Sequence, residues 1–326
     1  MIKSRMNRIA VMILALAVFT TGVCLGFSGK TPRERYEEKF DKTVSLASDG
    51  RVQIRNLSGL IKVESWARNE VKISAVKISR AGSQDRAKSN AALVIISVRE
   101  SGNTLDIETQ YPQTHNLFRR DDSINISVDY QLFIPEKASI KVNSMSGDVD
   151  VRKIGGFADI HVTSGDLTVS QAGNGLQVKV ISGTIRIDDV KGDITLRAVS
   201  GSVIVDGVRG SLDVDNTSGR VELRGVSEAD TVRAKSLSGG ISYEGKINPR
   251  GRYSFDVHSG TIEVVLPSDA AFELDAETFS GGIETDFAVQ VLGKVSRNEL
   301  HGTVNGGGAS LDLKTFSGNI RIRKSR

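Results

Sequence analysis

A Ser-Gly pair returns along this chain at a nearly constant interval. The steps between successive pairs are 18 residues four times, then 20, 21 and 21, and finally 37. The serines are Ser146, Ser164, Ser182, Ser200, Ser218, Ser238, Ser259, Ser280 and Ser317. A fixed period of this size is typical of a repeat architecture, in which each unit packs on its neighbour.

Each unit holds two short segments in which apolar and polar residues alternate. The residue three positions after the serine is aliphatic in all nine units, and in the unit of Ser182 the segment runs Ile185, Arg186, Ile187. A second alternating segment ends just before the serine, with Leu176, Val178 and Val180 as its apolar members. Alternation with period two predicts strands with one buried and one exposed face. Glycine favours corners between such strands, where φ is positive or two backbones approach closely.

Residues 141–326 are therefore predicted to form a parallel β-solenoid of about 18 residues and two strands per coil. The alternative is an antiparallel β meander, which would also alternate. A meander does not require residues 18 apart to resemble each other, so the solenoid is favoured. The 37-residue step indicates an insertion at 287–309, either an added hairpin using Val289, Val291 and Val295 or a mobile loop.

Residues 44–140 alternate less regularly and are predicted to form an N-terminal β cap region. Such a cap would cover the unpaired backbone groups of the first coil. Ser58-Gly59 is an early copy of the repeat, whereas 80–90 is polar and rich in turn residues. Residues 27–43 are predicted to be a linker, because 30–43 is charged and lacks a core pattern; a short helical turn is the alternative there.

The first 26 residues have the pattern of a signal peptide. Lys3, Arg5 and Arg8 precede an apolar run of eleven residues at 9–19, and small residues follow. This order predicts export, although an uncleaved N-terminal anchor is the alternative. Cys24 also suggests lipidation, but Val23 stands where a lipobox has Gly or Ala.

Charge and cysteine content limit the possible partners. The signal region carries three of the basic residues and no acid, so the net charge falls from +4 for the whole chain to +1 beyond residue 26. This is too little to predict nucleic-acid binding. Cys24 is the one cysteine, so the chain after the signal has no disulfide to form.

The repeated units SGDVDV at Ser146, SGDLTV at Ser164 and SGNIRI at Ser317 resemble a bacterial family of β-strand-repeat proteins. That family is grouped as a domain of unknown function and often labelled "putative adhesin". The resemblance covers roughly residues 44–323 and extends to FIPEKASI and to VVLPSDAAFELDAETFSGGI. It implies a β-repeat fold and a surface or adhesive role, and it allows a link to envelope stress.

Residues suited to catalysis or metal binding are not grouped in the sequence. The histidines are His115, His161, His258 and His301, and none has a partner at metal-ligand spacing. His301 is the single candidate site residue, because it lies in the insertion. Asp148 and Asp166 follow Ser-Gly as calcium ligands would, but Arg220 occupies the same place in another unit. These aspartates are therefore predicted to cap corner amides.

We thus predict an exported, non-enzymatic protein, an adhesin or cell-envelope scaffold, with no catalytic, cofactor-binding or metal residues and no cofactor. Its partner would be an envelope or surface protein or a glycan, with the membrane contacted only through an uncleaved or lipidated N-terminus. One alternative is a carbohydrate-active β-helix enzyme, in which Asp213, Asp215 and Glu222 would converge in a groove. Another is a membrane-tethered regulator of envelope stress.

Overall fold

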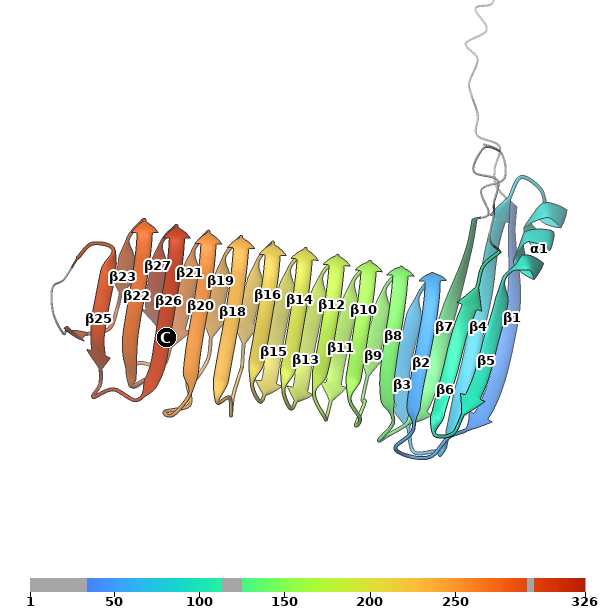
Figure 1. Ribbon diagram of the computed structural model, residues 1–326, viewed down its shortest axis with the longest axis horizontal. Coiled ribbons are helices and arrows are strands. Elements are labelled where there is room, and N and C mark those ends of the chain that lie inside the picture. The colour runs from blue at the N-terminus through green and yellow to red at the C-terminus, as the bar shows by residue number, and fades with distance from the viewer. Residues whose placement is uncertain (1–33, 113–124, 292–295, 326) are drawn as a thin grey trace, which may run out of the picture. The chain divides into compact units, whose positions relative to one another are not determined.

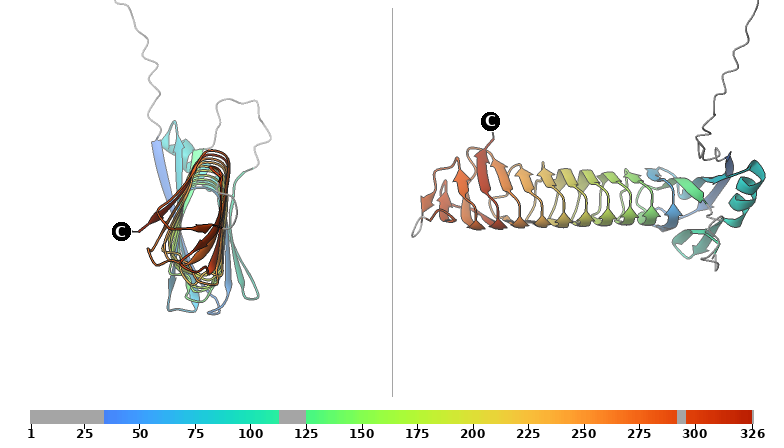
Figure 2. Two further views of the ribbon diagram at one scale, coloured as in Figure 1. Left: turned by 90° about the vertical axis from the view of Figure 1, so that its left-hand side faces the viewer. Right: turned by 90° about the horizontal axis from the view of Figure 1, so that it is seen from above.

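The computed structural model describes residues 34–112, 125–291 and 296–325. Within them, coils of two strands stack into two facing sheets, and most strands of each sheet are parallel (Figures 1 and 2). Neighbouring units are in register, because Ser164 pairs with Ser182, and Ser182 with Ser200. The predicted β-solenoid is confirmed, and the antiparallel meander is wrong for the repeat.

The described residues form thirteen strands in sheet A, fourteen in sheet B and one helix. In spatial order, sheet A contains β1 (Glu34–Ser45), β4 (Glu70–Ala81), β7 (Asn125–Pro135), β3 (Ile61–Trp66), β9 (Val149–Arg152), β11 (Leu167–Ala172), β13 (Ile185–Lys191), β15 (Val203–Arg209), β17 (Val221–Arg224), β19 (Ile241–Glu244), β21 (Ile262–Leu266), β27 (Ile320–Lys324) and β23 (Ile283–Thr285). Sheet B contains β24 (Gln290–Val291), β25 (Glu299–Val304), β22 (Phe272–Ser280), β26 (Ala309–Ser317), β20 (Arg252–Ser259), β18 (Thr231–Ser238), β16 (Leu212–Ser218), β14 (Ile194–Ser200), β12 (Leu176–Ser182), β10 (Ala158–Ser164), β8 (Ser139–Ser146), β2 (Arg51–Ser58), β6 (Thr104–Gln110) and β5 (Ile95–Ser101). The helix is α1 (Gln84–Leu93).

The core is a set of aliphatic ladders between the two sheets. Leu167, Ile185 and Val203 pair in register on successive strands of sheet A, and all three are fully buried. Each such side chain contributes about 1.5–3 kcal/mol through burial. The inward face predicted from the alternation is therefore correct.

The glycine of each Ser-Gly pair is required by the close stacking of the corners. Gly201 has φ of 135°, and a Cβ there would collide with the carbonyl oxygen of Gly183 in the neighbouring coil. Its N–H donates to the carbonyl of Ser218 in the next coil at 3.0 Å. Any side chain at this position would both strain the backbone and separate the coils.

The coil order departs from the chain order at both ends of the stack. The coil β26–β27 lies between β20–β21 and β22–β23, and the coil β2–β3 lies between β6–β7 and β8–β9. Our expectation that each unit lies on its predecessor is wrong at these places, because β22–β23 does not lie on β20–β21 and β8–β9 does not lie on β6–β7. At the C-terminal end, β25 pairs antiparallel with the outer edge of β22. The next strand in the sequence, β26, therefore pairs with the inner edge of β22.

Two elements at the N-terminal end correct the sequence interpretation. Residues 34–43, predicted as part of a linker, belong to β1, which pairs antiparallel with β4 along its whole length. Phe40 packs against the core, while most of the other side chains are exposed and charged, as suits an edge strand. Residues 84–93 form α1, where we expected a polar turn; Ser83 caps it, and Ala87 and Ala91 are buried.

The insertion forms the hairpin that was one of its two predicted forms. Strands β24 and β25 pair antiparallel, whereas Val295 lies outside the described residues. The predicted signal peptide at 1–26, with Cys24, also lies outside them. In the ranges that the structure describes, no helix has the length and hydropathy of a membrane span.

Candidate interaction surface

An exposed row of mainly apolar side chains runs along the Ser-Gly corner of sheet B. We call the residues immediately before each serine the corner row. In stack order they are Leu57, Met145, Thr163, Ile181, Val199, Thr217, Leu237, His258, Phe316 and Phe279. Seven of the ten are large and apolar, and their exposure ranges from 39% for Leu57 to 74% for Phe279.

The alternation of each strand explains why this row faces outward. In β18, Ala234 and Ser236 are buried, so Lys235 and Leu237 point away from the core. Packing of the core thus does not require an apolar residue at the Leu237 position. Scattered exposed apolar residues are common, but a row repeated in register along one face is a mark of an interaction surface.

Three rings form a stack at the C-terminal end of the corner row. The His258 and Phe316 centroids are 4.9 Å apart, and those of Phe316 and Phe279 are 4.8 Å apart. The ring planes are within 7° of parallel. This stack depends on the altered coil order, because β26 places Phe316 between the other two rings.

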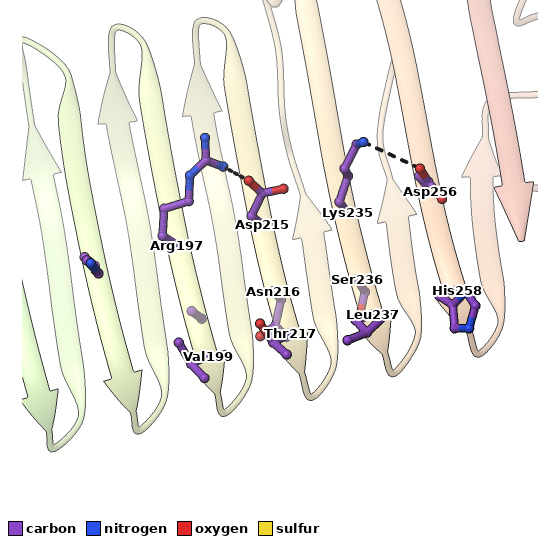
Figure 3. Close-up of a pocket in the computed structure, with 12 residues that line it drawn as sticks. Arg197, Val199, Asp215, Asn216, Thr217, Lys235, Ser236, Leu237, Asp256 and His258 are labelled. Carbon is purple, nitrogen blue, oxygen red and sulfur yellow. Dashed lines mark ion pairs between the residues drawn. The ribbon is translucent and has the colours of Figure 1, made fainter.

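A second outward row, two residues further back on each strand, is charged. We call it the charged row. In stack order it is Arg55, Asn143, His161, Lys179, Arg197, Asp215, Lys235, Asp256, Lys314 and Glu277. Figure 3 shows the central part of both rows, with ion pairs from Arg197 to Asp215 at 2.5 Å and from Lys235 to Asp256 at 3.6 Å. Lys179 makes no ion pair with any residue that the structure describes.

Shallow depressions lie between the two rows. One has a volume of about 570 Å³ and is lined by Arg197, Val199, Asp215, Leu237 and other members of both rows. Two more, of about 310 and 360 Å³, lie toward the two ends of the same rows. All three therefore belong to one strip along sheet B.

Buried polar residues beneath this strip donate hydrogen bonds to backbone carbonyls at the corners. Asn216 is 4% exposed, and its Nδ2 donates to the carbonyl oxygens of Gly201 at 3.3 Å and Gly219 at 3.1 Å. Thr278 Oγ1 donates to the carbonyl of Gly318 at 3.0 Å. These bonds satisfy corner carbonyls, so the strip has a rigid base.

The acids predicted for an enzymatic groove do not converge. Asp213 and Asp215 lie on β16 of sheet B, and both pair with Arg197, at 2.9 and 2.5 Å. Glu222 lies on β17 of sheet A and pairs with Arg224 at 3.1 Å. The three carboxylates are thus divided between opposite sheets, and the two on sheet B share one arginine.

The aspartates after Ser-Gly cap corner amides, as predicted. Asp148 Oδ1 accepts the backbone N–H of Asp166 at 2.9 Å, and Asp166 Oδ1 accepts that of Thr184 at 2.8 Å. Each carboxylate therefore joins one coil to the next.

The histidines are placed in three different ways. His161 lies on the charged row, with Nε2 3.1 Å from Asp159, and His258 belongs to the corner row. His301 lies on β25, where its Nδ1 is 2.9 Å from Asp275. His115 falls outside the described residues.

His301, Asp275 and Glu277 form a cluster that sequence reasoning missed, because strands far apart in the sequence bring them together. Their ligand-type atoms lie within 4.8 Å of one another, and all three side chains are half-buried. Lys314 already supplies a cation here, 3.7 Å from Asp312 and 3.9 Å from Glu277. Attraction to Asp312, with smaller contributions from Glu277 and Asp275, raises the pKa of Lys314 against the opposing effect of desolvation.

The sequence model of the Toastrack DUF4097 family matches residues 61–323, most of the chain. The chain belongs to this family. The matched range begins at β3 and ends in β27, so it contains every repeated coil except the first strand of the β2–β3 coil. A comparison with curated proteins finds no match.

Solved structures that are similar to this Toastrack chain include the following three. A "putative cell adhesion protein" of Clostridium sporogenes is 11% identical and covers 89% of this chain and 100% of its own, with a TM-score of 0.25. A "putative adhesin" of Bacteroides fragilis is 12% identical, covering 87% and 97%, with a TM-score of 0.44. One of Parabacteroides distasonis is 11% identical, covering 88% and 97%, with a TM-score of 0.48. The fold assignment rests on the strand register and the family match.

The corner row of this Toastrack chain was not predicted from the sequence, although a signal for it was present. The residue before each Ser-Gly is apolar in most units, as at Ile181, Val199 and Leu237. The alternation was used only to assign inward and outward faces, and the apolar residues at outward positions were not considered separately. An apolar residue at an outward position of a repeat is the signal that finds such a surface.

Proposed function

We propose that this Toastrack protein is an exported, non-enzymatic binding module or scaffold of the cell envelope, and that the corner row is its contact surface. The observation that carries the proposal is the exposed apolar row itself, held in register along the stack. Export is supported by the signal pattern at 1–26.

A stacked surface of this kind suits binding because the backbone that carries it is already held by strand hydrogen bonds. Each corner residue follows a buried residue of a hydrogen-bonded strand, as Leu237 follows Ser236. A partner therefore gains apolar contact with little further loss of conformational freedom, which is the main cost of forming an interface. The adjacent charged row supplies orientation and selectivity.

The test compares acidic substitutions of apolar residues on the outward faces of the two sheets. The double variant Leu237→Glu, Phe316→Glu places acids in the corner row, where both residues are exposed. The control Ile204→Glu makes the same change on the outward face of β15 in sheet A. Cosedimentation of each purified protein with isolated envelopes of the source bacterium measures retention.

We expect the wild-type protein and the control to be retained and the corner-row variant to be lost from the envelope fraction. Equal retention of all three would contradict the assigned surface. Failure of the wild-type protein to cosediment would contradict the envelope role. A native circular-dichroism spectrum and an unchanged melting temperature show that each variant is folded.

Export is tested by the intact mass of the protein recovered from envelope and extracellular fractions. A mass lacking the first 22–26 residues supports cleavage and release. Retention of the complete N-terminus favours the membrane-tethered alternative. Recovery only from the cytoplasm would contradict export.

A further inference from the structure

We propose that the partner of the corner row is a second copy of this chain, docked face to face with its stack running in the opposite direction. This inference rests on the proposed function, because it identifies the occupant of the same surface. The two-fold axis would run parallel to the strands, between β14 and β16, so that like rows face each other.

The apolar pattern of the corner row is symmetric about this axis. Counting outward from the axis, the facing pairs are Val199 with Thr217, Ile181 with Leu237, Thr163 with His258, Met145 with Phe316, and Leu57 with Phe279. Large apolar residues thus meet each other in three of the five pairs, and Thr163 meets His258 in a fourth, whereas the pair beside the axis joins Val199 to Thr217. A surface that binds itself through a two-fold axis requires such self-complementarity.

The charged row places a basic residue opposite an acidic residue in three of its five facing pairs about the same axis. The facing pairs are Arg197 with Asp215, Lys179 with Lys235, His161 with Asp256, Asn143 with Lys314, and Arg55 with Glu277. Bases dominate the half toward β2, and the acids of the row lie in the half toward β22. Reversing one stack against the other therefore brings the basic half over the acidic half.

The next outward row on sheet B agrees with this arrangement. Two positions before the charged row, Lys141 would face Asp312, and Gln53 would face Asp275. Asp159 would face Ser254, and Arg233 would face Gln177. No pair of this row joins like charges, so three adjacent rows accept one and the same axis.

The strip is large enough for a specific dimer. Ten coils at about 4.8 Å each, with three outward positions per strand, give roughly 45 Å by 13 Å, or about 600 Å² per copy. Burying about 1,200 Å² in total reaches the lower end of specific interfaces. Because the axis is parallel to the strands, the two sheets would pack with aligned strands, as in β-sandwiches.

One facing pair opposes the arrangement and provides a sharp test. Lys179 and Lys235 have like charge and would approach each other twice, once on each side of the axis. Lys235 has Asp256 at 3.6 Å, whereas Lys179 has no ion pair among the described residues. Replacing Lys179 by an acid should remove this repulsion and add an attraction.

Sedimentation velocity of the full chain tests the dimer first. We expect the wild-type protein and the Ile204→Glu control to sediment as dimers, and Leu237→Glu, Phe316→Glu to sediment as a monomer. A monomeric wild-type protein would overturn the inference, and so would a corner-row variant that remains dimeric. If the wild type is monomeric but only the corner-row variant loses envelope retention, the proposed function stands and the self-association fails.

Cross-linking then tests the direction of the stacks. With Cys24 replaced by serine, Ile181→Cys and Leu237→Cys in one chain lie three coils apart but face each other across the proposed axis. Because packed sheets lie about 10 Å apart, a bifunctional thiol cross-linker of about that length should convert this double variant largely into a covalent dimer. Leu57→Cys with Leu237→Cys is the matched control, since these positions do not face each other, and it should stay uncrosslinked. The reverse result would overturn the antiparallel arrangement.

Lys179→Glu separates self-association from binding of an anionic partner. For the dimer we expect the dissociation constant to fall about two- to tenfold, because two like-charge contacts become attractive. The reversed pair Lys179→Glu, Lys235→Glu restores repulsion and should return the constant to near the wild-type value. Weaker dimerisation on Lys179→Glu alone would contradict the proposed register.

Discussion

The interior of the stack and its two ends use the same coil but obey different rules of order. From β10 to β17, successive units are 18 residues apart and each lies directly on the preceding one. At the ends, the coils β2–β3 and β26–β27 are each inserted between two coils that follow one another in the sequence. The repeated sequence determines the conformation of each coil, whereas the strand edges that are still unpaired determine its position in the stack.

The ends differ from the interior because the outer strand edges of the terminal coils have no further coil to pair with. Antiparallel partners cover three of the four outermost strands, with β5 on β6 and β4 on β7 at one end and β25 on β22 at the other, while β23 is an edge strand of sheet A. The inner edge of each terminal coil therefore stays open to another segment of the chain, β2–β3 at the N-terminal end and β26–β27 at the C-terminal end. An open parallel edge would expose a row of unpaired backbone groups.

The largest expected effect is at the centre of the interior. Ile185→Asp places a carboxylate in a fully buried ladder, with apolar Leu167 and Val203 as its neighbours. We expect a loss of roughly 4 kcal/mol or more in the free energy of unfolding, seen as aggregation or failure to fold. Ile283→Asp in the terminal strand β23, where the side chain is only half-buried, should cost less and loosen that strand alone. Equal melting temperatures for the two variants would remove the distinction between interior and end.

The next largest expected effect is the loss of stability when a corner glycine of the interior is substituted. Gly201→Ala adds a Cβ that collides with the carbonyl of Gly183 at a φ of 135°, so we expect a loss of about 2–4 kcal/mol in urea unfolding. Gly102→Ala, at φ of 57° with open space around it, is the matched control and should cost about 1 kcal/mol. A Gly201→Ala protein as stable as the control would show that the corners are not closely stacked.

A buried hydrogen bond in the N-terminal end gives a smaller effect. Tyr130 is 2% exposed, and its hydroxyl lies 2.6 Å from Thr109 Oγ1; burial raises the pKa of this tyrosine. Tyr130→Phe leaves the Thr109 hydroxyl without this partner and should lower the free energy of unfolding by about 1–2 kcal/mol. Adding Thr109→Val should recover part of the loss, and strict additivity of the two changes would contradict the contact.

The smallest expected effect is that of low pH on the hydrogen-exchange protection of the C-terminal end. Hydrogen bonds from Arg323, at 3.0 Å, and from the Lys324 N–H, at 3.2 Å, lower the pKa of Asp286. A carboxyl group with a lowered pKa stabilises the fold above its unfolded pKa and loses this contribution as the pH falls through its folded pKa. Below about pH 4, hydrogen-exchange protection of β23 should therefore decrease before that of β13. Asp286→Asn should abolish this difference in pH response, and an unchanged response would refute the assignment to Asp286.

The sequence predicted the repeated coil well because its pattern is local. Alternation around Ile185 and the Ser-Gly corners specify strands, inward faces and coil length without reference to distant residues. The order of the terminal coils, the edge strand β1 and the helix α1 were missed. Charged β1 resembles a linker because an edge strand needs few buried residues, and α1 buries only Ala87 and Ala91, which leave no strong hydrophobic period. The cluster around His301 depends on pairing between β22 and β25, which no local pattern reveals.

The corner row joins the two regions, since it continues without a break from the interior into the inserted C-terminal coil. Its ring stack exists only if β26 lies between β20 and β22, so the surface depends on the altered order. If the coils followed the chain, Phe279 would lie next to His258, and Phe316 would lie beyond it.

The most direct test of this account is a short bifunctional thiol cross-linker applied to pairs of cysteines in the Cys24→Ser background, read by mass spectrometry. His258→Cys with Phe316→Cys should cross-link within one chain, because these residues occupy adjacent coils. His258→Cys with Phe279→Cys, two coils apart, should not. Efficient linkage of the second pair and none of the first would contradict the inserted coil and, with it, the continuous surface on which the proposed function rests.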